Sequence, residues 1–184
     1  MAVGRAAARA VVEPPQERHR RGRGSGRRPL ARAGSRSTLR CVAGQDIDIR
    51  RTLSAPPEAV WALLDDSASW PSWTPIDEHH PVGPAGPDGT GEERRFRNGR
   101  VTVHERIVER EPGRRLVYTL LGGLALRDYR AEITLAPRGP GTDLRWHTTF
   151  RPKVPGTGGL YRRAIAKSTR DFVDGLDAAT TPRR

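Results

Sequence analysis

From residue 92 onward, apolar and polar positions alternate, as they do in β-strands with one buried face. The alternation predicts strands over 92–98, 100–110, 115–121, 125–136 and 142–151. It is clearest in the last two, where the apolar face carries Tyr129, Ala131, Ile133 and Leu135, and then Leu144, Trp146, Thr148 and Phe150. Arg127 breaks the alternation, because it falls on the apolar phase at the start of its strand. Short turn sequences such as Asn98-Gly99 and Pro112-Gly113 predict that consecutive strands form an antiparallel meander.

The residues before this meander predict one strand and two short helices. Ile47, Ile49 and Leu53 indicate the strand. A helix is expected to begin near Pro56-Pro57-Glu58, because proline at the first helical position and an acid in the first turn favour a helix start. The stretch 65–67 interrupts this helix and can cap a second one, which ends within 70–75. The Pro- and Gly-rich region 81–92 predicts a loop.

A longer helix is predicted over 158–179. Its apolar face carries Tyr161, Ile165, Ser168, Phe172, Leu176 and Ala179 at three- and four-residue spacing. Together the elements predict an α+β fold, in which a curved antiparallel sheet of six to seven strands packs its apolar face on this C-terminal helix. A bent sheet wrapped on one helix leaves a cavity between them, and the two short helices are placed to close its mouth.

The positive charge of the chain is concentrated in its first quarter. The 184 residues carry a net charge of +12, but residues 1–43 alone hold 11 Arg, no Lys and two acids, whereas the rest holds 22 basic and 19 acidic residues. With no periodicity and almost no large apolar side chain, the first part predicts a disordered Arg-rich leader over 1–44, followed by a folded domain over 45–180 and a tail over 181–184.

Three interpretations of the leader remain open. The favoured one is a solvated segment, or translation from a start placed too far upstream. A cleaved organelle transit peptide is the second. An arm that contacts nucleic-acid backbone is the least favoured, because the segment has no aromatic residue to stack on bases.

Several classes of protein and site are excluded or disfavoured. No run of 18 apolar residues exists, so no membrane insertion is expected, and no secretory signal is present; we expect a cytoplasmic protein unless the leader targets an organelle. The single Cys41 excludes an internal disulfide and a Cys-based metal cluster. His79-His80 lack metal-ligand spacing and are interpreted as a solvated loop pair. No phosphate-loop or nucleophile motif is present, so we expect no cofactor and no metal; the sequence does not indicate an oligomeric state.

Four segments carry a family resemblance. They are Ile49 to Asp65 (IRRTLSAPPEAVWALLD), Trp70 to Trp73 (WPSW), Glu109 to Tyr118 (EREPGRRLVY) and Gly141 to Trp146 (GTDLRW). In this order, over about 48–178, they resemble the polyketide cyclase/dehydrase branch of the SRPBCC superfamily, which includes START lipid-transfer domains. The resemblance implies a helix-grip fold whose cavity binds an apolar or aromatic small molecule. If the protein is catalytic, it implies cofactor-independent aldol cyclisation or dehydration; the alternative is a non-enzymatic carrier or sensor of a lipid or other hydrophobic ligand.

The candidate catalytic residues are Glu105, His104 and Tyr129. In the strand over 100–110, the set containing Glu105 is the more apolar one, so Glu105 is expected to face the cavity and His104 the outside. A carboxylate inside an apolar cavity indicates an acid/base group or an ion pair with a neighbouring Arg, and the second is favoured. His104 would be a general base if it faced inward.

The candidate ligand-binding residues are Trp73, Tyr118, Tyr129, Trp146 and Phe172. A tryptophan or tyrosine offers an apolar ring and one hydrogen-bond donor, which suits the orientation of a flat or oily ligand. The alternative is that these rings are ordinary core residues. Trp61 is expected in the core.

Overall fold

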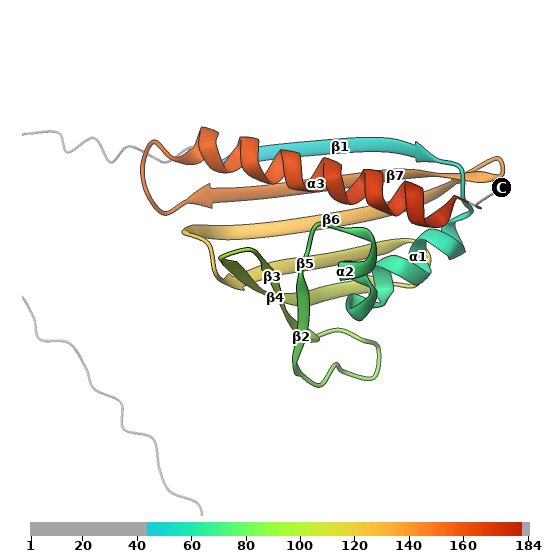
Figure 1. The fold of residues 1–184 in the computed structure, drawn as a ribbon, viewed down its shortest axis with the longest axis horizontal. Helices are drawn as coiled ribbons and strands as arrows, with labels where there is room; N and C mark the ends of the chain where they lie inside the picture. Colours follow the sequence, from blue (N-terminus) through green and yellow to red (C-terminus); the bar gives the residue numbers. More distant parts are fainter. Residues whose placement is uncertain (1–43, 182–184) are drawn as a thin grey trace, which may run out of the picture. The chain divides into compact units, whose positions relative to one another are not determined.

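A computed structural model describes residues 44–181 (Figure 1). The predicted leader, apart from Gly44, and the tail after Thr181 lie outside the described residues. The elements are β1 (Gln45–Leu53), α1 (Pro57–Asp65), the 3-10 helix η1 (Ser67–Ser69), α2 (Trp70–Trp73), β2 (Glu78–Gly83), β3 (Glu93–Asn98), β4 (Val101–Glu111), β5 (Arg115–Gly122), β6 (Leu126–Arg138), β7 (Gly141–Pro152) and α3 (Gly158–Thr180).

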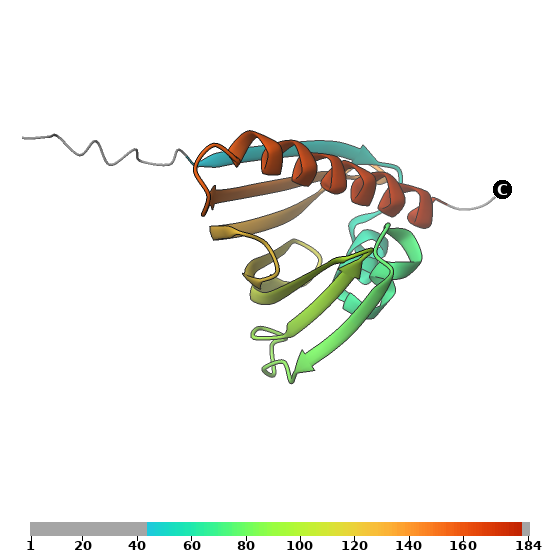
Figure 2. The same cartoon turned by 60° about the vertical axis from the view of Figure 1, so that its left-hand side comes forward.

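The seven strands form one antiparallel sheet in the order β1-β7-β6-β5-β4-β3-β2. Figures 1 and 2 show α3 running along the β1–β7 side of the sheet, while the β2–β3 side curves away below it. This arrangement confirms the predicted α+β helix-grip fold, with three short helical segments, α1, η1 and α2, between β1 and β2 where two short helices were predicted. No helix of the described residues is long and apolar enough to cross a membrane.

The predicted apolar faces of β6 and β7 are buried, and the break in the pattern at Arg127 has a structural cause. The register of β6 on β7 shifts by one residue between Arg127 and Arg130. Asp128, inside this bulge, has a φ of 53°. One extra residue in a strand reverses the side to which later side chains point. Leu126 and Tyr129, three residues apart, therefore both face inward.

The expectation of a loop over 81–92 is wrong at its start, because residues 81–83 complete β2. β2 is an edge strand, where Pro81 is tolerated since only one side of the strand needs backbone donors. The predicted loop pair of histidines also belongs to β2. His80 Nε2 lies 3.1 Å from Glu78 Oε2, and the His79 ring packs 5.3 Å from that of Phe96. No group of His, Cys, Asp and Glu that could hold a metal occurs between residues 44 and 181.

The core lies between the sheet, the short helices and the C-terminal half of α3. Its centre is Trp70, whose ring lies 5.2 Å from that of Phe96, 6.0 Å from that of Trp146 and 6.2 Å from that of Phe172. Trp70 Nε1 donates to the carbonyl oxygen of Leu64 at 3.1 Å, so the indole is both buried and satisfied. α3 can approach α2 closely because Gly175 has no side chain: a Cβ there would lie 1.8 Å from the carbonyl oxygen of Trp73.

An ion pair attaches the edge strand β1 to β7. Arg145 Nε and Arg50 Nη2 donate to the Asp48 carboxylate at 2.9 Å and 3.0 Å. The hydrogen bonds from Arg145 and then from Arg50 lower the pKa of Asp48 to about 2.

We predict that Asp48→Asn lowers the free energy of unfolding at pH 7 by less than about 1 kcal/mol, because the pair is partly exposed to water. A carboxyl whose pKa is lower in the folded state stabilises the fold above its unfolded value, near 3.8, and that contribution is lost as the pH falls toward 2. Urea unfolding of both proteins at several pH values should therefore show a difference that shrinks between about pH 4 and pH 2. A difference of the same size at pH 7 and pH 2 would contradict this.

Candidate functional site

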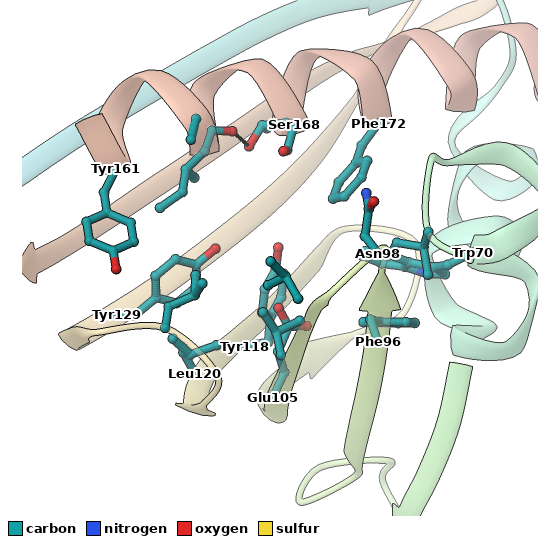
Figure 3. Close-up of a pocket in the computed structure, with 17 residues that line it drawn as sticks. Trp70, Phe96, Asn98, Glu105, Tyr118, Leu120, Tyr129, Tyr161, Ser168 and Phe172 are labelled. Atoms are coloured by element: carbon teal, nitrogen blue, oxygen red, sulfur yellow. Dashed lines mark hydrogen bonds between the residues drawn. The ribbon is translucent and has the colours of Figure 1, made fainter. Parts of the chain in front are cut away.

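A cavity of about 340 Å³ lies between the inner face of the sheet and α3 (Figure 3). Its wall is mainly aromatic and aliphatic. The side chains that Figure 3 labels are Trp70 from α2, Phe96 and Asn98 from β3, Glu105 from β4, Tyr118 and Leu120 from β5, Tyr129 from β6, and Tyr161, Ser168 and Phe172 from α3.

α3 contributes two neighbouring stripes of side chains. Tyr161, Ser168 and Phe172, which share the face predicted from the sequence, point into the cavity (Figure 3). The adjacent residues Thr169 and Val173 are buried. Ser168 is exposed although it lines the cavity, so the cavity opens to solvent near this part of the helix.

Two tyrosines supply hydroxyl groups to the cavity. Their ring centroids lie 6.4 Å apart. Tyr118 comes from the regular part of β5, opposite Ala131, and Tyr129 lies in the bulged part of β6, on the same face as Ala131. Burial raises the pKa of both phenols far above the ordinary value, so both stay protonated at neutral pH. The Tyr118 hydroxyl hydrogen-bonds to that of Tyr129, so the O–H of Tyr129 is the donor that the pair can offer to an acceptor in the cavity.

A buried ion pair lies at the inner end of the cavity. Arg94 is fully buried, and its Nε and Nη2 lie 3.3 Å from Oε2 of Glu105, which is 8% exposed. Arg94 Nη1 donates to Ser67 Oγ at 3.0 Å, and Ser67 Oγ donates to Glu92 Oε1 at 2.6 Å. The guanidinium therefore joins β3 to β4 and to the short helix η1.

The same guanidinium packs against three aromatic rings. Its Cζ lies 4.4 Å from the ring centroid of Trp70 and 5.0 Å from those of Phe96 and Tyr118. Contact with aromatic faces stabilises a cation that has lost its water. Arg94 lies behind the cavity wall and is not a lining residue, so only Glu105 of the pair lines the cavity.

Two opposing effects act on the Glu105 carboxyl. Burial raises its pKa, and the charge and hydrogen bonds of Arg94 lower it. The net effect is a raised pKa. A carboxyl of this kind can exchange a proton with a bound molecule more readily than an exposed glutamate at neutral pH.

The structure brings four of the candidate residues together at the cavity: Glu105, Tyr118, Tyr129 and Phe172. Trp73 and Trp146 are buried beside Trp70 and are not among the lining residues. His104 lies on the outer face of the sheet, where its Nε2 is 2.9 Å from Glu93 Oε2. Trp61 is in the core, as expected.

Residue periodicity did not identify Arg94, Trp70, Phe96 and Ser168 as residues of the site. A signal for Arg94 was present, because it shares the apolar phase of its strand with Phe96. An arginine on the buried phase of a strand needs a carboxylate partner, and Glu105 stands opposite it in the register of β3 on β4.

Residues 44–180 match the family model described as polyketide cyclase/dehydrase and lipid transport. Comparison with the curated proteins gives no match.

Solved structures share the fold. A solution structure from Thermobifida fusca is 26% identical, with a TM-score of 0.63 over 72% of this chain and 90% of that one. A START superfamily protein from Mycobacterium smegmatis is 15% identical, with a TM-score of 0.64 over 73% and 96%. The ZhuI aromatase/cyclase from Streptomyces sp. R1128 is 14% identical, with a TM-score of 0.66 over 75% and 94%. At identities this low, the last two show the fold alone.

We predict that Glu105→Leu destabilises the protein by about 3–5 kcal/mol, because it leaves the Arg94 charge buried without its carboxylate. Adding Arg94→Met to Glu105→Leu should recover much of this loss, since no uncompensated charge then remains. Urea unfolding of the two single variants and the double variant measures the coupling. Asp171→Leu, which breaks the exposed pair with Lys167, is the control and should have little effect. If Glu105→Leu lowers the free energy of unfolding no more than this control does, the buried pair does not hold the site together.

Proposed function

The chain belongs to the polyketide cyclase/dehydrase and lipid transport family, and we propose that its cavity binds an apolar or aromatic small molecule that carries a carbonyl or hydroxyl group. The observation that carries this proposal is a cavity with an aromatic wall that also presents two tyrosine hydroxyls and one carboxyl group. A few placed polar groups in an otherwise apolar pocket are typical of sites that orient a small ligand.

The size of the cavity and the aromatic side chains of its wall support the proposal of a flat or flexible apolar ligand. The cavity volume of about 340 Å³ suits one small molecule rather than a whole phospholipid. Trp70, Phe96 and Phe172 present ring faces or edges to it, and aromatic ligands pack on such rings in offset or edge-to-face arrangements.

The polar groups of the cavity support the proposal that the ligand carries an oxygen atom that accepts a hydrogen bond. Because burial keeps Tyr118 and Tyr129 protonated and Tyr118 donates to Tyr129, the pair can offer the Tyr129 O–H to a carbonyl or hydroxyl oxygen. Donors that are already in place inside an apolar site bind an acceptor without first losing a shell of water.

A second candidate function, cofactor-independent cyclisation or dehydration of a ketone chain, is favoured by Glu105. Its carboxylate would take a proton from the carbon between two carbonyls, while a tyrosine hydroxyl donates to the carbonyl oxygen on which the enolate charge develops. The enolate carbon would then form a bond with a second carbonyl carbon of the same chain. The resulting alkoxide takes up a proton, and water leaves in the dehydration. A carrier or sensor would use the same cavity without this proton transfer.

We predict that Ser168→Trp blocks the cavity and weakens binding at least tenfold, because the indole would occupy the opening without removing a core contact. Binding of a neutral naphthyl ketone dye, followed by its blue-shifted fluorescence, is the measurement. Native mass spectrometry of the purified protein identifies any ligand that co-purifies. Ala178→Trp, at an exposed position on the same helix, is the matched control and should bind the dye like the original protein. Equal dye binding by both variants would show that the dye does not enter this cavity.

A second experiment separates catalysis from carriage. If the protein is a cyclase or dehydratase, Glu105→Gln should reduce turnover of a linear poly-β-ketone by about 10²-fold or more, and Tyr129→Phe by less. Both variants should still bind the dye, and their unfolding curves check that they are folded. Conversion of such chains that is unchanged in both variants would exclude the proposed catalytic roles. A carrier would bind the chain without converting it.

A further inference from the structure

Two buried polar groups lie behind the wall of the cavity. Trp146 and Thr148 are neighbours on the inner face of β7, with exposed fractions of 1% and 0%. Within residues 44–181, neither Trp146 Nε1 nor Thr148 Oγ1 makes a hydrogen bond of normal geometry. Neither side chain lines the cavity. A buried N–H or O–H that lacks a full hydrogen bond is costly, so the presence of two such groups side by side needs an explanation.

The sheet places these groups next to the phenols of the cavity. Tyr118, Ala131 and Thr148 stand opposite one another on β5, β6 and β7. Tyr129 lies two residues before Ala131, on the same face of β6. Because Ala131 carries only a methyl group, the hydroxyl-bearing side chains around it can approach one another.

Each of the two buried groups acts on one phenol. The indole N–H of Trp146 interacts with the hydroxyl of Tyr118, and the hydroxyl of Thr148 interacts with that of Tyr129. Both interactions oppose the rise in pKa that burial causes, as donors to a phenol oxygen do. Tyr118 acts on Tyr129 in the same sense. Trp146, Tyr118, Tyr129 and Thr148, in this order, therefore form a connected set of polar groups, which we call the polar row.

The first member gives the polar row a direction. An indole nitrogen can only donate, so Tyr118 accepts on the side of Trp146. A phenol has one proton, and Tyr118 directs its own toward the oxygen of Tyr129. Thr148 offers a second donor to the same oxygen. The lone pairs of the Tyr129 oxygen thus face two donors, and its proton is the one that remains for the cavity.

The Tyr129 hydroxyl therefore offers a ligand a donor and no free acceptor. A carbonyl oxygen, which only accepts, satisfies this hydroxyl completely. An alcohol oxygen can accept the same proton, but the alcohol's own proton then finds no lone pair on Tyr129. It has to find another acceptor in a wall that is mainly apolar, and a polar group that stays unpaired in such a site weakens binding.

We propose that Trp146 and Thr148 are positioning residues that set the specificity of the cavity: they fix the direction of hydrogen bonding, so that Tyr129 receives a carbonyl oxygen in preference to a hydroxyl group. This role rests on the proposed function, because it concerns the oxygen atom of the ligand that the cavity binds. It narrows the polar group of that ligand from a carbonyl or hydroxyl group to a carbonyl group. Both residues would act through the phenols and not by contact with the ligand.

The contact between Trp146 and Tyr118 can be tested without a ligand. The chain has four tryptophans, so its ¹H–¹⁵N spectrum contains four indole signals, and Trp146→Phe identifies the signal of Trp146. Tyr118→Phe should shift that signal upfield, because the indole proton loses its acceptor while the ring of residue 118 stays in place. The signal of Trp73, whose Nε1 donates to Ser69 Oγ, should not move. An unchanged Trp146 signal would overturn the proposed role.

The specificity is tested by isothermal titration calorimetry of the full chain with the neutral naphthyl ketone dye and with the alcohol made by reducing its ketone. Thr148→Val keeps the shape of the side chain and removes the hydroxyl, and Trp146→Phe keeps an aromatic ring and removes the N–H. The matched controls are Thr142→Val, on the same strand, and Trp73→Phe. Each control removes a side-chain donor outside the polar row. Unfolding curves check that all variants are folded.

We expect the original protein and both controls to bind the ketone about fivefold more tightly than the alcohol, which corresponds to one hydrogen bond. In Thr148→Val the ratio should fall below about twofold, because a lone pair of Tyr129 becomes free to accept the alcohol proton. Trp146→Phe should lower it as well, because Tyr118 can then accept from Tyr129 and the direction of the polar row is no longer fixed. Thr148→Ser, which retains the hydroxyl, should restore the ratio.

The possible failures are distinguishable. Equal binding of ketone and alcohol by the original protein would overturn the positioning role and leave the proposed function standing. A ratio that Thr148→Val and Trp146→Phe retain, or that the controls lose equally, would have the same consequence, since a change in packing alone alters both affinities together. If neither compound binds the original protein, the proposed function fails, and the positioning role fails with it.

Discussion

A guanidinium group with no access to water constrains this domain more than any other single group. Arg94 is fully buried, and an arginine in that position needs a carboxylate, further acceptors and packing around its flat faces. Glu105 supplies the carboxylate, Ser67 the acceptor, and the rings of Trp70 and Tyr118 part of the packing. These partners come from η1, α2, β4 and β5. The single charge therefore fixes the short helical segments on the sheet and, at the same time, defines the inner end of the cavity.

The cavity also depends on a local defect in the sheet. The one-residue bulge in β6 reverses the directions of the side chains that precede it, so that Leu126 faces inward together with Tyr129 and Ala131. Without it, the alternation that continues from Ala131 and Ile133 would place Arg127 inside. The bulge thus keeps a second uncompensated charge out of the interior and adds Leu126 to the buried apolar residues. Its backbone requires a residue that tolerates a positive φ, and an aspartate at this position is among the less strained choices.

The sequence predicted the parts of this arrangement that follow from periodicity. Alternation placed Glu105 inward and His104 outward, and helical spacing placed Phe172 on the inner face of α3. It could not predict β2, because a six-residue edge strand with Pro81 has no buried face to reveal it. Nor could it separate Trp70, which lines the cavity, from Trp73 and Trp146, which do not. All three rings are buried. Which of them reaches the cavity depends on how α2 packs against α3, and that packing involves contacts between residues far apart in the sequence.

The way in which the charge beside the cavity is satisfied bears on the proposed ligand. The charge of Arg94 is paired and shielded, so a ligand would meet neutral phenol groups and one carboxyl group. A molecule that was charged at its leading end would lose its water against the aromatic wall before it reached a partner, which is costly. A molecule with a neutral oxygen at its leading end and an apolar body satisfies the phenols and fills the wall without that cost. The charge distribution therefore supports the proposal of a neutral, oxygen-bearing apolar ligand inside the cavity.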